Sequence, residues 1–310
     1  MFNRIGIRAL VVVVAVLLLL FLLAHFFSLR SSERSFRSIV YEVDTATVIT
    51  LRLEPRNTRH REVVLQRAPD GWKVSYDNGT FLADTAQMHR MLASFRQLRS
   101  KRYVGQLSQV DERYDLVDTL ENRITITTVD GTNTLLHLGR STYAPGDIGA
   151  WTYVNRDGER EVYAVEGLLS NLVDQAPPEW RPHHLVMGDP ANWRSVTFIY
   201  PQDSGYVFER TPEGWTMNGS QVDTTRVSRF MLSLSRSRAQ QFADDRSVEG
   251  LVPLYQVKVD DRTRPEPILV RAYPAGDTFL ITSTANPGVL MAFDPRQEFP
   301  RLFRPRGFWF

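Results

Sequence analysis

The sequence predicts an α+β protein in which an N-terminal transmembrane helix precedes two tandem, internally duplicated lobes of antiparallel sheet with one main helix each. Three observations predict this architecture. An uninterrupted apolar run covers residues 9–24 of the 310. A Pro-acid-Gly-Trp turn occurs twice, ending in Trp72 and in Trp215. Each copy is followed by an Asn-Gly pair, an Asp-Thr helix start and an amphipathic helix, an order that chance rarely repeats.

The composition is that of a folded protein and excludes several classes of function. Apolar residues make up 43% and charged residues 23%, as in packed globular domains. The formal net charge of +2 provides no overall field for binding nucleic acid. The chain contains no cysteine, which excludes disulfides, thiolate metal sites, cysteine nucleophiles and a lipid-modified N-terminal cysteine.

The N-terminal segment carries a targeting signal. Arg4 and Arg8 precede the apolar run, which at about 1.5 Å per residue is long enough to cross a hydrocarbon core of about 30 Å. A cleaved signal peptide is the alternative, but it usually ends in a small-x-small site, which is missing here. We therefore expect a single-pass protein of a bacterial inner membrane, with its C-terminal domain in the periplasm. The expected segments are a cytoplasmic N-terminus at 1–8, an anchor at 9–27 and a polar tether at 28–44.

The first lobe is predicted over residues 45–185. Its periodicity predicts strands at 48–53, 63–67 and 72–76, closed by an Asn78-Gly79 type I′ turn. Asp84 is the expected N-cap of the main helix, with Gln87 as its capping-box partner. The apolar face of this helix is predicted to hold Met88, Met91, Leu92, Phe95 and Leu98. Further strands are expected at 124–127, 135–138, 151–155 and 162–165, with a loop at 141–149 and a short helix at 166–173.

The second lobe, residues 186–310, repeats this order. Strands are expected at 196–200 and 206–210, and Trp215 begins a third. Asp223 caps a helix whose apolar face is Val227, Phe230, Met231 and Leu234. Four more strands are predicted at 255–259, 268–270, 279–281 and 289–293. The proline-containing stretch 177–190 is predicted to join the two lobes.

Short motifs of the first lobe carry a resemblance to a known family. They are Gly71-Trp72, Leu82-Ala83-Asp84, a basic helix exit at 96–103, Leu138-Gly139-Arg140, Tyr153-Val154 and Val162-Tyr163-Ala164-Val165. In these motifs the chain resembles the family called domain of unknown function 4340, over most of residues 48–185 and more weakly in the second lobe. The resemblance implies a single-anchor bacterial envelope protein that accompanies ABC-type transport components, including those linked to gliding motility. No activity is established for the family.

The two repeated tryptophans have two interpretations. Trp72 and Trp215 could serve as stacking platforms for a sugar or a base. Alternatively, each ring packs the sheet of its own lobe against the main helix. The repetition favours packing, because two equivalent positions suit a shared structural role.

Arginines and the aromatic C-terminus are the other candidate contact residues. The positions of Arg99, Arg102 and Arg238 predict a basic polar face on each main helix, which either docks on an acidic partner or anionic headgroups or is simply solvated. Trp309 and Phe310 end the chain and either form an exposed docking peptide or pack on the second lobe. The complete basic sets are Arg96, Arg99, Lys101 and Arg102 in the first lobe and Arg226, Arg229, Arg236 and Arg238 in the second.

No catalytic pattern is visible in the sequence. His183 and His184 are adjacent, point in different directions on most backbones, and lack a third ligand nearby in sequence. The acidic run at 111–118 lacks the ligand order of a calcium loop. Phosphate-binding loops and nucleophile elbows are absent from the sequence. We therefore expect no enzyme activity, no cofactor and no metal.

The functional expectation is an accessory or scaffold subunit of an envelope transport complex. Its expected partners are membrane lipid around the anchor and a membrane protein such as an ABC transporter permease. Two alternatives stay open: a periplasmic glycan- or lipid-binding module with a groove between the lobes, and an unrecognised hydrolase.

Overall fold

The structure is a computed structural model that describes residues 16–18, 37–77, 79–143, 149–296 and 298–309. These residues belong to two compact units, Met1–Arg181 (unit 1) and Pro182–Phe310 (unit 2). Most of the predicted anchor and tether, residues 9–36, lies outside the described residues. Of the anchor, residues 16–18 are described and are helical. Within the described ranges, no helix is long and apolar enough to cross a membrane.

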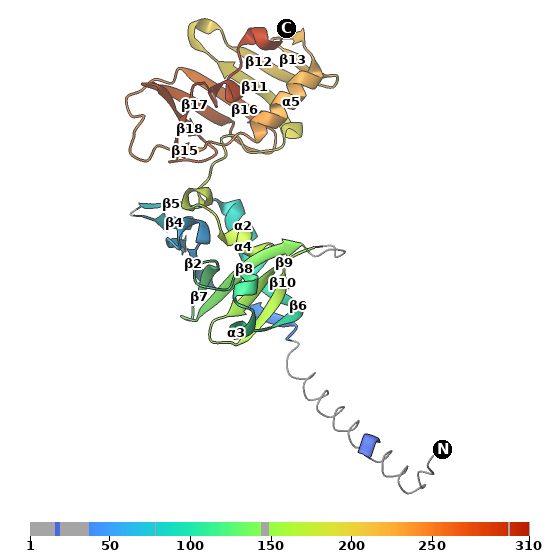
Figure 1. Ribbon diagram of the computed structural model, residues 1–310. Coiled ribbons are helices and arrows are strands. Elements are labelled where there is room, and N and C mark those ends of the chain that lie inside the picture. The colour runs from blue at the N-terminus through green and yellow to red at the C-terminus, as the bar shows by residue number, and fades with distance from the viewer. Residues whose placement is uncertain (1–15, 19–36, 78, 144–148, 297, 310) are drawn as a thin grey trace, which may run out of the picture. The chain divides into compact units, whose positions relative to one another are not determined.

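Unit 1 is built on an antiparallel sheet that has ten strands among its described residues (Figure 1). In spatial order the strands are β1-β6-β10-β9-β8-β7-β2-β3-β4-β5. Their bounds are β1 Ile39–Glu42, β2 Val48–Glu54, β3 Val63–Ala68, β4 Gly71–Tyr76, β5 Gly79–Leu82, β6 Gln97–Gln106, β7 Asn122–Thr128, β8 Asn133–Tyr143, β9 Ala150–Arg156 and β10 Glu161–Glu166. The helices are α2 Thr85–Phe95, α3 Leu107–Val110 and α4 Leu169–Val173, with 3-10 turns η1 Arg56–Thr58, η2 Glu112–Tyr114 and η3 Pro177–Trp180.

Unit 2 contains a second antiparallel sheet, with nine strands in the described part of the chain (Figure 1). Their spatial order is β14-β13-β12-β11-β16-β17-β18-β19-β15. The bounds are β11 Trp193–Ile199, β12 Tyr206–Thr211, β13 Gly214–Met217, β14 Ser220–Gln221, β15 Gln241–Phe242, β16 Tyr255–Asp261, β17 Ile268–Ala275, β18 Thr278–Ser283 and β19 Leu290–Phe293. The helices are α5 Thr224–Ser235 and α6 Phe299–Leu302, with 3-10 turns η4 Pro190–Asn192, η5 Pro201–Asp203 and η6 Arg306–Trp309.

The two sheets have the same strand order once β1 is set aside. Reading from β6 to β5 in unit 1 and from β15 to β14 in unit 2 gives the same succession of strands along the chain. The register agrees as well: Arg67 pairs with Trp72 in one sheet, and Arg210 pairs with Trp215 in the other. The turn, tryptophan and helix that recur in the sequence therefore occupy equivalent places in two similar α+β units.

Even β1 has an equivalent in unit 2. Ile39 of β1 pairs with Arg99, and His184 forms an antiparallel bridge with Arg238. Arg99 and Arg238 each lie just after the main helix of their unit. The predicted join therefore contains the first paired segment of unit 2, and the unit boundary falls between Arg181 and Pro182.

Each unit also closes with a short helix, a 3-10 turn and a buried tryptophan. In unit 1, α4 and η3 lead to Trp180, and in unit 2, α6 and η6 lead to Trp309. Trp180 is 0% exposed and Trp309 is 3% exposed. The carbonyl of Trp180 accepts a hydrogen bond from the N–H of Asp84, and the carbonyl of Phe308 accepts one from the Arg226 guanidinium. Both closing turns thus bind the start of the main helix in their own unit.

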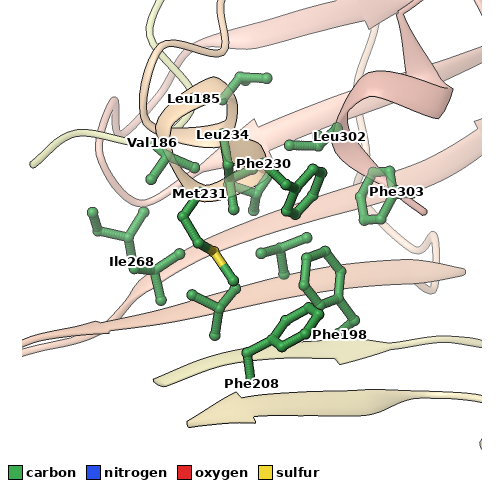
Figure 2. Close-up of a cluster of buried hydrophobic side chains, with 14 of the residues drawn as sticks. Leu185, Val186, Phe198, Phe208, Phe230, Met231, Leu234, Ile268, Leu302 and Phe303 are labelled. Carbon is green, nitrogen blue, oxygen red and sulfur yellow. The ribbon is translucent and has the colours of Figure 1, made fainter. Parts of the chain in front are cut away.

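The core of each unit lies between the main helix and one face of the sheet. The predicted helix residues Met88, Met91, Leu92 and Phe95 are buried in unit 1, as are Val227, Phe230, Met231 and Leu234 in unit 2. Figure 2 shows Phe230, Met231 and Leu234 of α5 directed toward the strands that carry Phe198 and Phe208. Burial of such apolar faces is the main favourable term for both folds.

Several predicted details of unit 1 are wrong. Helix α2 ends at Phe95, so Leu98 and the basic stretch after it belong to β6 rather than to a helix. Gly79 pairs with Tyr76 as the first residue of β5, so it lies in a strand and not in the turn. Gln87 donates its N–H to the Asp84 carboxylate as expected, but its side chain bonds to Gln175, which removes the reciprocal half of the capping box.

The loop predicted at residues 141–149 is also shorter than expected. Strand β8 continues to Tyr143, and its pairing with β9 shifts register between Leu138 and Ser141, which marks a β-bulge. The close approach of another backbone explains the glycine inside this bulge. A Cβ at Gly139 would collide with the carbonyl oxygen of Tyr114.

Candidate functional site

The two repeated tryptophans are buried in their own units. Trp72 is 8% exposed and Trp215 is 3% exposed. An arginine on the neighbouring strand covers each ring: the Arg67 guanidinium carbon lies 5.2 Å from the centre of Trp72, and that of Arg210 lies 5.1 Å from the centre of Trp215. In such a cation–π contact the charged arginine covers the face of the buried indole. Both indoles therefore pack within their own units, as the second interpretation proposed, and neither has a free face on which a ligand could stack.

Of the predicted arginines, Arg226 and Arg229 lie exposed on α5, whereas the candidate contact residues Arg99, Arg102 and Arg238 lie beyond the ends of the main helices. Arg99 and Arg102 belong to β6, and Arg238 follows α5 and bridges to His184. The expectation that Arg99 and Arg102 belong to a basic helix face is wrong, because the helix stops before them. Together with Lys101 they form an exposed basic strand.

This basic strand has few direct ion pairs. Lys101 lies 3.4 Å from the Glu166 carboxylate, and Arg99 donates to the side chain of Gln97. The Arg102 guanidinium lies 5.6 Å from the centre of the Trp151 ring. At the equivalent position of unit 2 the strand carries Gln241, since Arg102 pairs with Ala164 and Gln241 pairs with Ala292. The cation at position 102 is therefore specific to unit 1, whereas Arg99 has a basic equivalent in Arg238.

The aromatic C-terminus is part of the unit 2 core. The Trp309 ring centre lies 5.0 Å from those of both Phe208 and Phe230. The neighbouring Phe308 is exposed, with the Arg304 guanidinium 4.7 Å from its ring centre. Phe310 lies outside the described residues. Trp309 therefore packs on the second lobe, as one of the two interpretations of the sequence proposed.

A row of charged residues that was not predicted from the sequence crosses unit 1 on the sheet face opposite the helix. Glu121 is 2% exposed and accepts hydrogen bonds from Arg123 Nε at 2.6 Å and from His137 Nδ1 at 3.0 Å. Arg123 also lies 2.6 Å from Asp118 and 3.4 Å from Glu54. The sequence signal that could have revealed this cluster is the opposite charges of Glu121 and Arg123, two residues apart at the start of β7.

These contacts shift the pKa values of the central groups. Hydrogen bonding to Glu121 raises the pKa of His137, against the opposing effect of burial. Burial alone would raise the pKa of Glu121, but its bonds from His137 and Arg123 outweigh burial and lower it. The cluster is therefore a set of mutually satisfied charges, which is typical of a structural network.

Two cavities lie among the described residues of unit 1 and could hold a ligand. The larger, about 680 Å³, lies beside β1 and the turn between β7 and β8. Tyr41 and Thr134 share a hydrogen bond at its wall, and Arg37 and Arg156 at its rim both approach the Glu159 carboxylate, at 2.8 and 3.6 Å. Its size suits a small molecule. Its lining mixes two arginines with three carboxylates, so charge alone selects no ligand class.

The smaller cavity, about 310 Å³, is called the polar hollow below. It lies where η1, the loop before β7, the β8 bulge and α4 meet. Its walls are Arg56, Asp115, Arg140, Ser141, Ser170, Asn171 and Asp174. Arg140 belongs to the Leu-Gly-Arg motif that supported the family resemblance.

The histidine pair does not form a metal site in the described structure. His183 is 4% exposed, and its Nδ1 donates to the carbonyl of Ala239 at 2.9 Å. The ring also packs against Phe242, with centroids 4.9 Å apart. In the part of the chain that the structure describes, no group of three or more His, Asp or Glu residues is placed to hold a metal ion.

Comparison with known proteins places the sequence in a family. A family model described as Domain of unknown function (DUF4340) matches residues 80–253, more than half of the chain. The chain belongs to this family. No curated protein and no solved structure matches it. The DUF4340 match runs from β5 to the residues just before β16, so it includes both main helices, the basic strand and most of the polar hollow.

Proposed function

We propose that this DUF4340 protein is a non-enzymatic, single-pass protein of the bacterial inner membrane whose two units face the periplasm. In this proposal it is an accessory or scaffold subunit of an ABC-type transport complex. The apolar run at residues 9–24, preceded by Arg4 and Arg8, supports the membrane anchor. The family resemblance supports the class of partner.

The observation that carries the docking role is the basic strand of unit 1. Arg99, Lys101 and Arg102 are exposed along β6, and their positive charge suits an acidic surface on a partner protein. Unit 2 has the same strand order and keeps a cation at the position of Arg99, namely Arg238, but has Gln241 at the position of Arg102. Arg102 has no cationic equivalent in unit 2, and a role in binding explains its charge better than the needs of the fold.

The anchor is tested by membrane fractionation of the full chain. We expect the protein to stay in the membrane pellet through alkaline carbonate and high-salt washes, because an apolar span leaves the bilayer only in detergent. A C-terminal reporter that is active only in the periplasm should be active on this chain. Release of the protein by carbonate would contradict the anchor, and an inactive reporter would contradict the orientation.

The partner is tested by purification from membranes in mild detergent. The tagged full chain should recover a transporter permease or another membrane protein of the same complex. A triple reversal of Arg99, Lys101 and Arg102 to glutamate should lose this partner, because like charges repel at close range. The matched control reverses the exposed Arg229 and Arg264 of unit 2, and it should retain the partner. Binding to anionic vesicles without a protein partner would replace the docking proposal with a lipid contact.

A further inference from the structure

The polar hollow of unit 1 is built by features that unit 2 lacks. Strand β8 makes a bulge at Gly139 and Arg140, where two residues occupy the space of one on the partner strand. Because Gly139 has no side chain, the backbone of Tyr114 can approach it closely. This approach places Asp115 beside the bulge, at the rim of the cavity. Bulges next to binding sites often redirect a side chain in this way.

Buried polar groups hold the opposite wall in place. Asn122 is 1% exposed, and its side chain accepts a hydrogen bond from the N–H of Arg56 and donates to the hydroxyl of Ser170 at 2.7 Å. Ser170 is itself 6% exposed and lines the hollow. Its hydroxyl accepts from Asn122 and still carries a proton to donate. Buried hydrogen bonds of this kind fix the geometry of a site.

Both arginines of the hollow are oriented by contacts on its rim. Arg140 donates to the carbonyl of Arg113, and its guanidinium lies 5.8 Å from the Tyr114 ring centre. Arg56 donates to the carbonyl of Leu120 and lies 3.6 Å from the Asp174 carboxylate. Each guanidinium has five N–H groups, so these contacts leave donors for a ligand.

The equivalent place in unit 2 is filled with aromatic rings. Strand β17 pairs regularly with β18 there: Tyr273 pairs with Leu280 and Pro274 with Phe279. Tyr255, at the position of Asn122, packs on Phe299 of α6 at 4.8 Å between ring centres. Phe279 and Phe303 stack on the Phe299 ring, with ring centres 4.5 and 4.7 Å from it. One copy of the fold thus packs this space as core, while the other keeps it open and polar.

From this contrast we propose that the polar hollow is a binding site for a small zwitterion, namely a free α-amino acid. The two arginines and two aspartates of the lining balance in charge, so a ligand with one net charge would leave an opposing group unpaired. An amino acid brings a carboxylate for an arginine and an ammonium for an aspartate. The lining residues include no aromatic ring, so the platform on which sugars usually stack is missing. The volume of about 310 Å³ is sufficient for one amino acid.

This proposal is independent of the transport role and is tested on the purified full chain in detergent. Isothermal titration with the individual L-amino acids should reveal saturable binding of at least one of them. The Arg140→Ala variant should weaken that binding at least about tenfold, because a charge-assisted contact to the carboxylate is lost. Ser141→Ala, a smaller change at the same rim, should weaken it less. The exposed Arg229→Ala variant in unit 2 is the control and should bind as the parent does.

Three results would overturn the proposal. The first is that no L-amino acid binds at concentrations up to about 10 mM, far above the affinities of most small-molecule sites. The second is binding of inorganic phosphate or glucose without any amino acid, which would show a different ligand chemistry. The third is binding that Arg140→Ala and Ser141→Ala both leave unchanged while circular dichroism shows both variants folded.

Discussion

Arg67 and Arg210 each cover a buried tryptophan from the neighbouring strand of the same hairpin. The register that places them there is the same in both units. The arginine stem shields the indole from water while its charged end stays solvated. The arginine–tryptophan pair is therefore a packing feature that occurs in both units, not a platform for a ligand. Most of its contribution to stability comes from burial of the tryptophan ring.

We expect Trp72→Ala and Trp215→Ala each to lower the free energy of unfolding of their unit by about 3–5 kcal/mol, because a large buried ring leaves a cavity. Arg210→Ala should cost only about 0.5–1 kcal/mol, the value of a cation–π contact near the surface. Urea unfolding followed by circular dichroism measures both effects. An equal loss for Arg210→Ala and Trp215→Ala would show that the arginine, not the indole, holds the hairpin.

The Glu121 cluster predicts a pH dependence for the stability of unit 1. The pKa of His137 is raised above 6.5, so its contribution is complete below that pH and is lost as the pH rises through the folded pKa. The pKa of Glu121 is lowered below 4.5, so its contribution is complete above that pH and is lost as the pH falls through the folded pKa. Both contributions are therefore present between these two values.

The matching experiment compares the parent with His137→Gln in urea at several pH values. The stability advantage of the parent should be largest between pH 4.5 and 6.5 and should shrink as the pH rises through the folded pKa of His137. Substitution of the exposed His89, which lies outside the cluster, should leave the pH profile unchanged. An advantage that grows with rising pH would mean that His137 acts as a neutral packing residue.

Among the helices and strands, the sequence periodicity correctly predicted the helix starts and most strands, which depend on residues close together in the chain. Both main helices begin at the expected caps: the Asp84 side chain accepts from the N–H of Gln87, and the Asp223 side chain accepts from that of Arg226. Most strands also fall where alternating residues indicated them. The end of α2 at Phe95 was not predicted, because Leu98 continues the apolar periodicity of the helix and no glycine or proline follows Phe95 to mark its end. Pairing of β6 with β1 and β10, which is distant in sequence, ends the helix instead.

The candidate sites were predicted less well than the fold. The sequence singled out Trp72, Trp215 and Trp309, which are all buried in their own units. It did not indicate the polar hollow, because its walls come from segments more than a hundred residues apart and depend on a bulge that no residue pattern announces. The equivalence of Trp180 and Trp309 was also missed, since the segments around them share little beyond the tryptophan.

The bulge in β8 offers a test at this scale. Gly139→Ala places a methyl group against the Tyr114 carbonyl, so we expect a loss of about 1–3 kcal/mol in unfolding free energy and a distorted hollow. Gly307→Ala is the control, because its added Cβ would meet nothing within 4 Å. Urea unfolding of both variants measures the difference. Equal stability of the two would show that the bulge tolerates a side chain.

For the whole molecule, the structure shows two units of one strand order that differ in what they leave open. Unit 2 fills its space with aromatic rings and closes with Trp309. Unit 1 keeps two cavities and an exposed basic strand. Features that both units share are explained by the packing of the fold. Features found in only one unit are therefore better candidates for binding another molecule. We therefore propose that unit 1 makes the contacts with other molecules and that unit 2 has a mainly structural role.

Site-specific photocrosslinking distinguishes the two units in this respect. A photoreactive residue replaces Arg102 in β6 or its equivalent Gln241 in β15, which are both exposed, and each variant is crosslinked as the full chain in cells. We predict a crosslink to a membrane protein from position 102 and none from position 241. Crosslinks of equal yield from both positions, or from position 241 alone, would contradict the claim.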